Sequence, residues 1–162
     1  MHTLSSSDLR ASFVNASRKE RSDASIPDLD AVDFDALDYL GWRDTKFDGR
    51  AYAVIPAPDG EPIGILLRQA DATPRTRTQC SWCRDVRLPN DVVFYAAKLA
   101  GPAGKRGSTV GTLVCRDFQC SANVRRDPPR PFPGYDMDAA REERIAALRA
   151  TSASFADRVR RG

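Results

Sequence analysis

Four cysteines are the residues of this 162-residue chain whose types and spacing point most clearly to chemistry. They form two close pairs that are separated by 31 residues, and no cysteine is left over. A two-residue spacer lets one tight turn direct two thiolates at one ion, while a second element supplies the remaining two ligands. The pattern therefore predicts one zinc ion per chain, bound by Cys80, Cys83, Cys115 and Cys120.

Two other interpretations of the cysteines remain open at this level. Two disulfides would use the same residues, but a chain without a secretion signal is expected in a reducing compartment, where disulfides rarely persist. A redox-active pair at Cys80 and Cys83 would leave Cys115 and Cys120 without a role. With four protein thiolates the ion would keep no open position for water or substrate, which indicates a structural metal.

The segments around the cysteines favour a treble-clef arrangement. The first pair would lie on a knuckle, the β-branched and aromatic segments 92–99 and 109–115 would form a hairpin behind it, and Cys120 would open a short helix that reaches Arg126. Glycines and Pro102 between the two segments indicate a flexible hairpin tip.

The N-terminal half is expected to add short helices and a second hairpin. Apolar residues at helical spacing predict a helix over 7–16 and another over 32–40, which Gly41 would end. The apolar runs 51–55 and 63–68 flank a turn rich in proline and glycine, which indicates a β-hairpin. The polar residues 71–79 are expected to form a loop that leads to the first cysteine pair.

The C-terminal part is expected to be one long helix. Prolines mark a linker over 128–136, and residues 137–161 then carry an apolar seam of Ile145, Leu148, Phe155 and Val159. The seam could dock on the rest of the chain or pair with a partner helix. The predicted fold class is thus α+β, with antiparallel hairpins, a treble-clef zinc finger with four cysteine ligands, short N-terminal helices and a long C-terminal helix.

The charge is unevenly distributed along the chain. Residues 1–70 carry a net charge of −4 and residues 71–162 one of +7, although the whole chain reaches only +3. A basic half can face phosphates or an acidic protein. A zinc-finger module that binds ribosomal RNA or other nucleic acid is therefore one functional hypothesis; it would use Arg75, Arg77, Lys105, Arg106, Arg125 and Arg126.

Composition argues against an enzyme. The single histidine, His2, lies at the N-terminus, so a histidine general base has no good candidate. The 101–111 segment lacks the leading glycine and the Ser or Thr of a phosphate-binding loop, and no small-molecule substrate is expected. No apolar run approaches the length of a membrane span, which favours a cytoplasmic location without membrane contact.

An ordered set of motifs resembles a known family. The chain is similar to the treble-clef zinc-finger domain of the elongation-factor-G-binding proteins, the family of the fusidic-acid-resistance (FusB-like) proteins. The resemblance covers approximately residues 9–126 and rests on Phe13-Val14-Asn15, Leu40-Gly41-Trp42-Arg43-Asp44, Tyr52-Ala53-Val54, Gly64-Ile65-Leu66-Leu67-Arg68, Cys80-Ser81-Trp82-Cys83 and Gly111-Thr112-Leu113-Val114-Cys115.

The resemblance implies a zinc-containing binding protein of the translation apparatus. Its implied partner is elongation factor G, whose release from the ribosome it would modulate, with ribosomal RNA as a further possible contact. The resistance proteins are larger at the N-terminus and carry an aromatic residue after the second ligand and a histidine ligand, where this chain has Val86 and four cysteines. These differences favour family membership over drug resistance.

The implied organisation has three parts: a binding domain over 1–127 with the finger at 80–126, a linker over 128–136, and a helix over 137–162. Trp82 and Phe118 lie inside the ligand spacers, where they could serve a partner or the domain's own core. The expected partner surface comprises Trp82, Val86, Lys105, Arg106, Phe118, Arg125 and Arg126.

Overall fold

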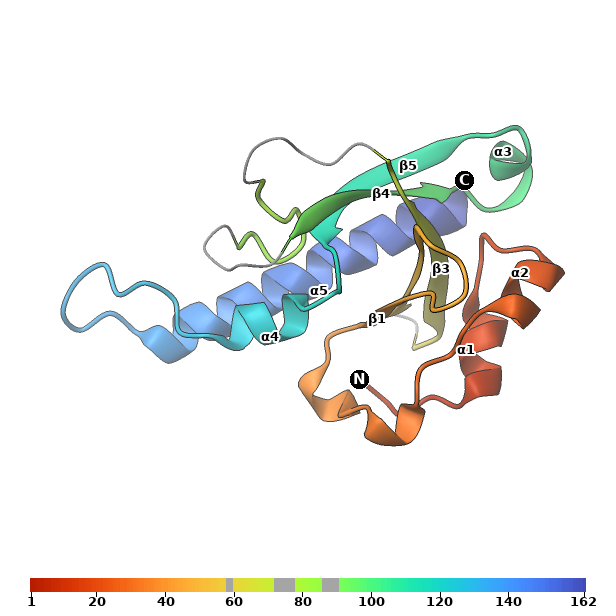
Figure 1. Ribbon diagram of the computed structural model, residues 1–162. Coiled ribbons are helices and arrows are strands. Elements are labelled where there is room, and N and C mark those ends of the chain that lie inside the picture. The colour runs from red at the N-terminus through yellow and green to blue at the C-terminus, as the bar shows by residue number, and fades with distance from the viewer. Residues whose placement is uncertain (58–59, 72–77, 86–90) are drawn as a thin grey trace.

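The computed structural model describes residues 1–57, 60–71, 78–85 and 91–162. Its centre is a five-stranded antiparallel sheet in which neighbours along the chain are neighbours in space, in the order β1-β2-β3-β4-β5 (Figure 1). The strands are β1 (Leu40–Arg43), β2 (Arg50–Pro56), β3 (Pro62–Gln69), β4 (Val92–Lys98) and β5 (Thr109–Cys115). Both hairpins expected from the sequence, β2–β3 and β4–β5, are confirmed.

Five α-helices surround the sheet in the described part of the chain. Two of them begin at serines that form capping boxes, in which Ser5 pairs with Asp8 and Ser17 with Glu20. The helices are α1 (Ser6–Ser12), α2 (Arg18–Asp23), α3 (Gly101–Lys105), α4 (Cys120–Arg125) and α5 (Met137–Arg161).

The prediction of a helix over 32–40 is wrong. Two 3-10 turns, Leu29–Ala31 and Phe34–Ala36, occupy this region, and β1 begins at Leu40. Asp28 and Asp33 accept backbone N–H groups at the start of the turns, and such local bonds compete with an α-helix. Gly41 lies inside β1, where the ring of Phe118 occupies the space that a side chain would need.

Two apolar layers enclose β2 and β3. Alternate residues face opposite sides, so Ile65 and Leu67 join the core under α5, while Leu66 packs with the N-terminal segment. Both strands are therefore buried nearly throughout. In β4, by contrast, only alternate residues are buried, because one face is covered and Phe94 on the other face is 39% exposed.

Helix α5 packs lengthwise on the sheet and shares its core (Figure 1). All four residues of the expected seam are buried, which confirms docking in cis, and the helix bounds agree with the expected 137–161. Ser152, which interrupts the seam, is also buried and donates its hydroxyl to the carbonyl of Leu148 at 2.9 Å. The helix is thus a layer of the same core.

None of the helices described combines the length and apolar character that a bilayer span requires.

Candidate metal centre

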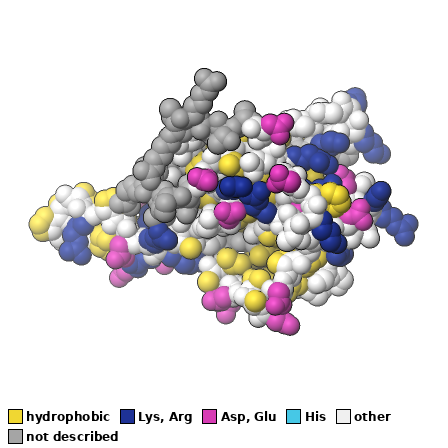
Figure 2. Space-filling view, in the orientation of Figure 1, with side chains coloured by type: hydrophobic (Ala, Val, Ile, Leu, Met, Phe, Trp, Pro, Cys, Tyr) yellow, Lys and Arg dark blue, Asp and Glu magenta, His cyan; other side chains and the backbone are white. Residues whose placement is uncertain are grey.

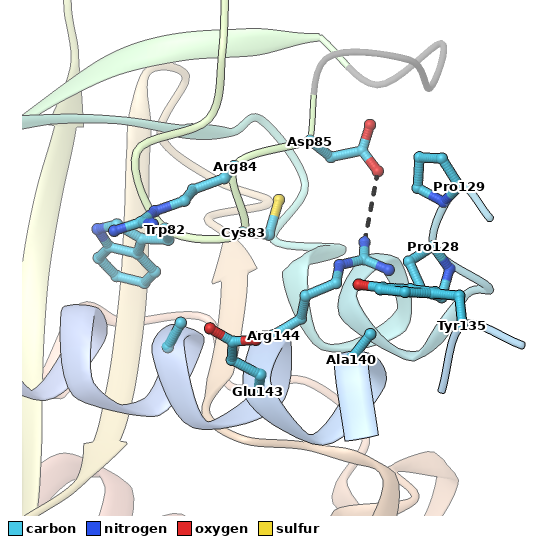
Figure 3. Close-up of a pocket in the computed structure, with 11 residues that line it drawn as sticks. Trp82, Cys83, Arg84, Asp85, Pro128, Pro129, Tyr135, Ala140, Glu143 and Arg144 are labelled. Atoms are coloured by element: carbon cyan, nitrogen blue, oxygen red, sulfur yellow. Dashed lines mark ion pairs between the residues drawn. The ribbon is translucent and has the colours of Figure 1, made fainter. Parts of the chain in front are cut away.

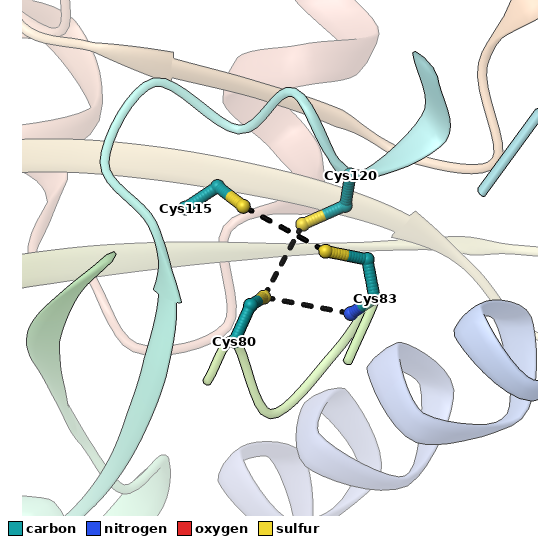
Figure 4. A group of neighbouring side chains, drawn as sticks. All are labelled: Cys80, Cys83, Cys115 and Cys120. Atoms are coloured by element: carbon teal, nitrogen blue, oxygen red, sulfur yellow. Dashed lines mark hydrogen bonds between the residues drawn. The ribbon is translucent and has the colours of Figure 1, made fainter. Parts of the chain in front are cut away.

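Three elements bring the four cysteines together. Cys80 and Cys83 lie in a tight turn that precedes β4, Cys115 ends β5, and Cys120 opens α4 (Figure 4). Ser81 N–H donates to the carbonyl of Leu113 at 2.8 Å, which fastens the turn to the edge of β5. This is the knuckle, hairpin and helix arrangement expected from the sequence.

The sulfur positions fit a tetrahedral zinc ion. The Sγ atoms of Cys80 and Cys120 are 3.7 Å apart, as are those of Cys83 and Cys115, and all four lie within 4.8 Å of one another. A regular tetrahedron with Zn–S bonds of about 2.3 Å separates its sulfurs by about 3.8 Å. All four cysteines are free and buried, so the alternative of two disulfides is not what the structure shows.

Two residues with positive φ complete the ligand loops. Arg84 has φ of 57° directly after the second ligand, and its N–H donates to the carbonyl of Cys80 at 2.9 Å. Phe118 has φ of 60°, and its N–H donates to the carbonyl of Cys115 at 3.0 Å. The left-handed backbone lets each loop reverse within a few residues, so the sulfurs converge.

Asn123 supports the centre from α4, and the sequence analysis missed it. Its side-chain amide donates to the sulfurs of Cys83 and Cys115 at 3.7 and 3.5 Å, and the residue is completely buried. Arg144 of α5 donates to the carbonyl of Asn123 at 2.9 Å and lies 3.9 Å from Asp85 beside the knuckle. The helix α5 thereby braces the ligand loops.

The four thiols shift one another's pKa values. Hydrogen bonds from neighbouring thiols, chiefly Cys115, lower the pKa of Cys80, whereas the same crowding raises the pKa of Cys120 well above its usual value. Burial, followed by the charge of the nearby Cys120 sulfur, raises the pKa of the Tyr39 hydroxyl. Four buried thiolates can coexist only when a bound metal compensates their charge.

Trp82 and Phe118 belong to the core rather than to an exposed surface. They are 1% and 6% exposed. The ring of Trp82 packs edge-on against Tyr39 at 4.9 Å and tilted against Phe155 at 5.7 Å, while Phe118 stacks on Tyr95 at 5.5 Å. The packing alternative is therefore the one the structure supports.

The basic residues expected at a partner surface do not form one surface. Arg125 binds the fully buried carboxylate of Asp38, so its charge is used inside the molecule. Arg126 is exposed near the centre, but Lys105 ends α3 and Arg106 follows it, at the far end of the β4–β5 hairpin from Cys115. A seven-residue strand separates the two ends, which corresponds to about 20 Å. Val86, Arg75 and Arg77 lie outside the described residues.

Comparisons with known proteins agree with this geometry. No curated protein matches the chain. The structure resembles that of the fusidic acid resistance protein FusC, with a TM-score of 0.58 and 23% identity over 76% of this chain and 53% of FusC, which shows a shared fold. The chain thus spans about half the length of that protein. The family model for the FBP C-terminal treble-clef zinc-finger matches residues 8–159, and the chain belongs to that family.

Proposed function

We propose that this protein binds elongation factor G through the face beside its zinc centre and modulates the factor's release from the ribosome. Membership of the FBP C-terminal treble-clef zinc-finger family supports this proposal, together with the fold shared with a fusidic acid resistance protein. The similarity of the motifs to elongation-factor-G-binding proteins supports elongation factor G as the partner.

The observation that carries the proposal is an exposed aromatic tip on the loop that follows α4, the helix that Cys120 opens. Between α4 and α5 the chain projects as a loop, at the end of the molecule opposite α3 (Figure 1). Phe132 lies in this loop and is 58% exposed, the largest value among the large hydrophobic side chains described. Its ring packs edge-on against Tyr135 at 5.4 Å. Exposed aromatic residues of this kind contribute most of the binding energy in many protein interfaces.

A hollow lies between this loop and the knuckle. Its volume is about 380 Å³, and it reaches from Trp82 and Cys83 to Pro129 and Tyr135 across α5. Figure 3 shows Arg84 and Glu143 on one side of it, facing the prolines and Tyr135 on the other. A hollow with a mixed apolar and charged lining suits a protruding side chain of a protein partner.

The zinc centre would act as scaffold in this function. Four thiolates fill the coordination sphere, and the ion holds the knuckle and α4 in the positions that shape the hollow. We therefore propose binding without a catalytic step.

Binding to purified elongation factor G, measured by surface-immobilised association with the zinc-loaded protein, tests the proposal. Phe132→Ser should weaken affinity at least about tenfold, mainly through faster dissociation. Phe47→Ser is the matched control, because Phe47 is 41% exposed in the loop between β1 and β2. Equal losses for both variants, or no wild-type binding at tens of micromolar, would contradict the proposal.

A further inference from the structure

Exposed cations gather at the end of the molecule that carries α3, far from the zinc centre. Contacts between distant segments bring them together: Asn15 donates to the carbonyl of Lys98 at 2.9 Å, and Ala100 N–H donates to the carbonyl of Val159 at 2.8 Å. Four elements, α2, β4, α3 and α5, and the turn after α3 thus supply the residues. We define this basic end as Arg18, Lys19, Lys98, Lys105, Arg106 and Arg158, all of them exposed.

The charges of the basic end are not used inside the protein. In the described part of the chain, no hydrogen bond or ion pair engages any of these six side chains, whereas other arginines are committed to carboxylates, as Arg125 is to Asp38. Two of the acidic residues nearby have partners of their own. Asp157 is held by Arg160 and Arg161 at 3.2 and 2.7 Å, and Glu20 by Arg68 at 3.1 Å.

The residues on the surface between these cations have small side chains, and two of them are polar. Gly107, Ser108 and Thr109 are exposed at the turn into β5, where hydroxyl groups can donate to an oxyanion. None of the large exposed hydrophobic residues among those described belongs to the basic end, since these are Phe47, Phe94 and Phe132. Figure 2 shows dark blue side chains crowding this end of the molecule, while hydrophobic ones mark the opposite tip.

We propose that the basic end binds the phosphate backbone of a nucleic acid, without base recognition. Flexible cations spread over several elements suit a chain of phosphates, which needs many point charges and releases counterions on binding. A protein interface or a membrane would favour an apolar centre, which this end lacks. None of the large exposed aromatic residues described belongs to this end, which argues against base stacking. The proposal stands independently of the function proposed above, because the two surfaces lie at opposite ends.

Fluorescence anisotropy with a labelled, mixed-sequence, single-stranded RNA of about 20 nucleotides tests this proposal on the full, zinc-loaded chain. If most of the six cations meet phosphates, the slope of log affinity against log salt should be about −3 to −4. Lys105→Glu with Arg106→Glu should weaken binding at least about tenfold at low salt and make the slope shallower by about one to two.

The matched control reverses two exposed arginines near the opposite end, Arg126→Glu with Arg130→Glu, and should leave RNA affinity within about threefold of wild type. Phe132→Ser should also retain RNA binding, so failure of the elongation-factor proposal would be seen separately. Equal losses in the two charge-reversed variants would overturn the proposal, as would absent wild-type binding at low salt. It would also be overturned if Lys105→Glu with Arg106→Glu spared RNA but impaired binding to elongation factor G or to anionic lipid vesicles.

Discussion

Asn123 reaches the sulfurs of two ligands from inside the core, and its carbonyl is in turn held by Arg144. N–H donors to a metal-bound thiolate stabilise its charge and fix its direction. At the scale of single residues, the metal centre therefore includes Asn123 and Arg144 in addition to its four cysteines.

We predict that Asn123→Leu, which keeps the size of the side chain but removes both N–H donors, lowers zinc affinity about 10- to 100-fold. Competition with a chromogenic chelator measures the change. Ala122→Ser is the control, because Ala122 is exposed on the same helix. A zinc affinity within about twofold of wild type would show that the amide has no influence on the metal.

Gly41 is a second residue on which the packing of the ligand loop depends. A Cβ atom there would lie 2.4 Å from Cγ of Phe118. Gly41→Ala should therefore destabilise the protein by about 1–3 kcal/mol in urea denaturation with saturating zinc. The penalty should shrink in a Phe118→Gly background, since Cβ, Cγ and Cδ1 of Phe118 are the atoms that the new methyl group would meet. An unchanged penalty there would place the strain elsewhere.

The ligands could be predicted from the sequence, but their supports could not. Zinc binding requires particular ligand types at short spacing, and each cysteine pair lies within a stretch of at most six residues. Asn123 and Cys83 are 40 positions apart in the sequence, and Asp38 and Arg125 are 87 apart. No local sequence pattern therefore predicts either contact. Trp82 and Phe118 illustrate the same limit, because an aromatic residue in a ligand spacer fits a core or an interface equally well.

At the scale of elements, a buried carboxylate connects α4, α5 and the segment before β1. Asp38 accepts from Arg125 and, at 2.8 Å, from Arg149, while its own N–H donates to the hydroxyl of Ser121 at 3.0 Å. The carboxylate is fully buried, whereas the two guanidinium groups remain partly exposed. The position of α5 thus depends on one acidic residue that faces two helices.

Asp38→Asn should destabilise the protein by about 1–3 kcal/mol, since the charge is lost while both arginines can still reach water. Urea unfolding followed by circular dichroism measures the loss. Asp35→Asn, at an exposed position in the same segment, should change stability by less than about 0.5 kcal/mol. Similar values for the two variants would mean that Asp38 does not hold the helices.

Helix α5 and the two hairpins were predictable because periodicity over many residues, or turn chemistry between apolar runs, determines them. The helix predicted over 32–40 does not form, and the reason is physical. Its apolar spacing is helical, but aspartate side chains close 3-10 turns there, and pairing with β2 draws Leu40 and Gly41 into a strand. Helix α2 was missed because none of its residues is buried and its capping box is its main sequence signal.

At the scale of the whole molecule, the fold separates two kinds of surface. The aromatic loop and the hollow lie beside the zinc centre, and the basic end lies beyond the far end of the β4–β5 hairpin. The sheet and α5 connect them as one core. A protein partner and a nucleic acid could thus be bound at the same time without competing for residues.

The metal centre holds the knuckle and α4 in place at one end of this arrangement. Elemental analysis of the protein purified without added metal, combined with circular dichroism before and after chelation, tests it most directly. We predict one zinc equivalent per chain and unfolding of at least residues 80–126 on its removal, because structural zinc contributes about 10–16 kcal/mol of apparent binding energy in finger peptides. Cys83→Ser should behave like the chelated protein. A wild-type chain that contains no zinc and is nevertheless fully folded would contradict the account.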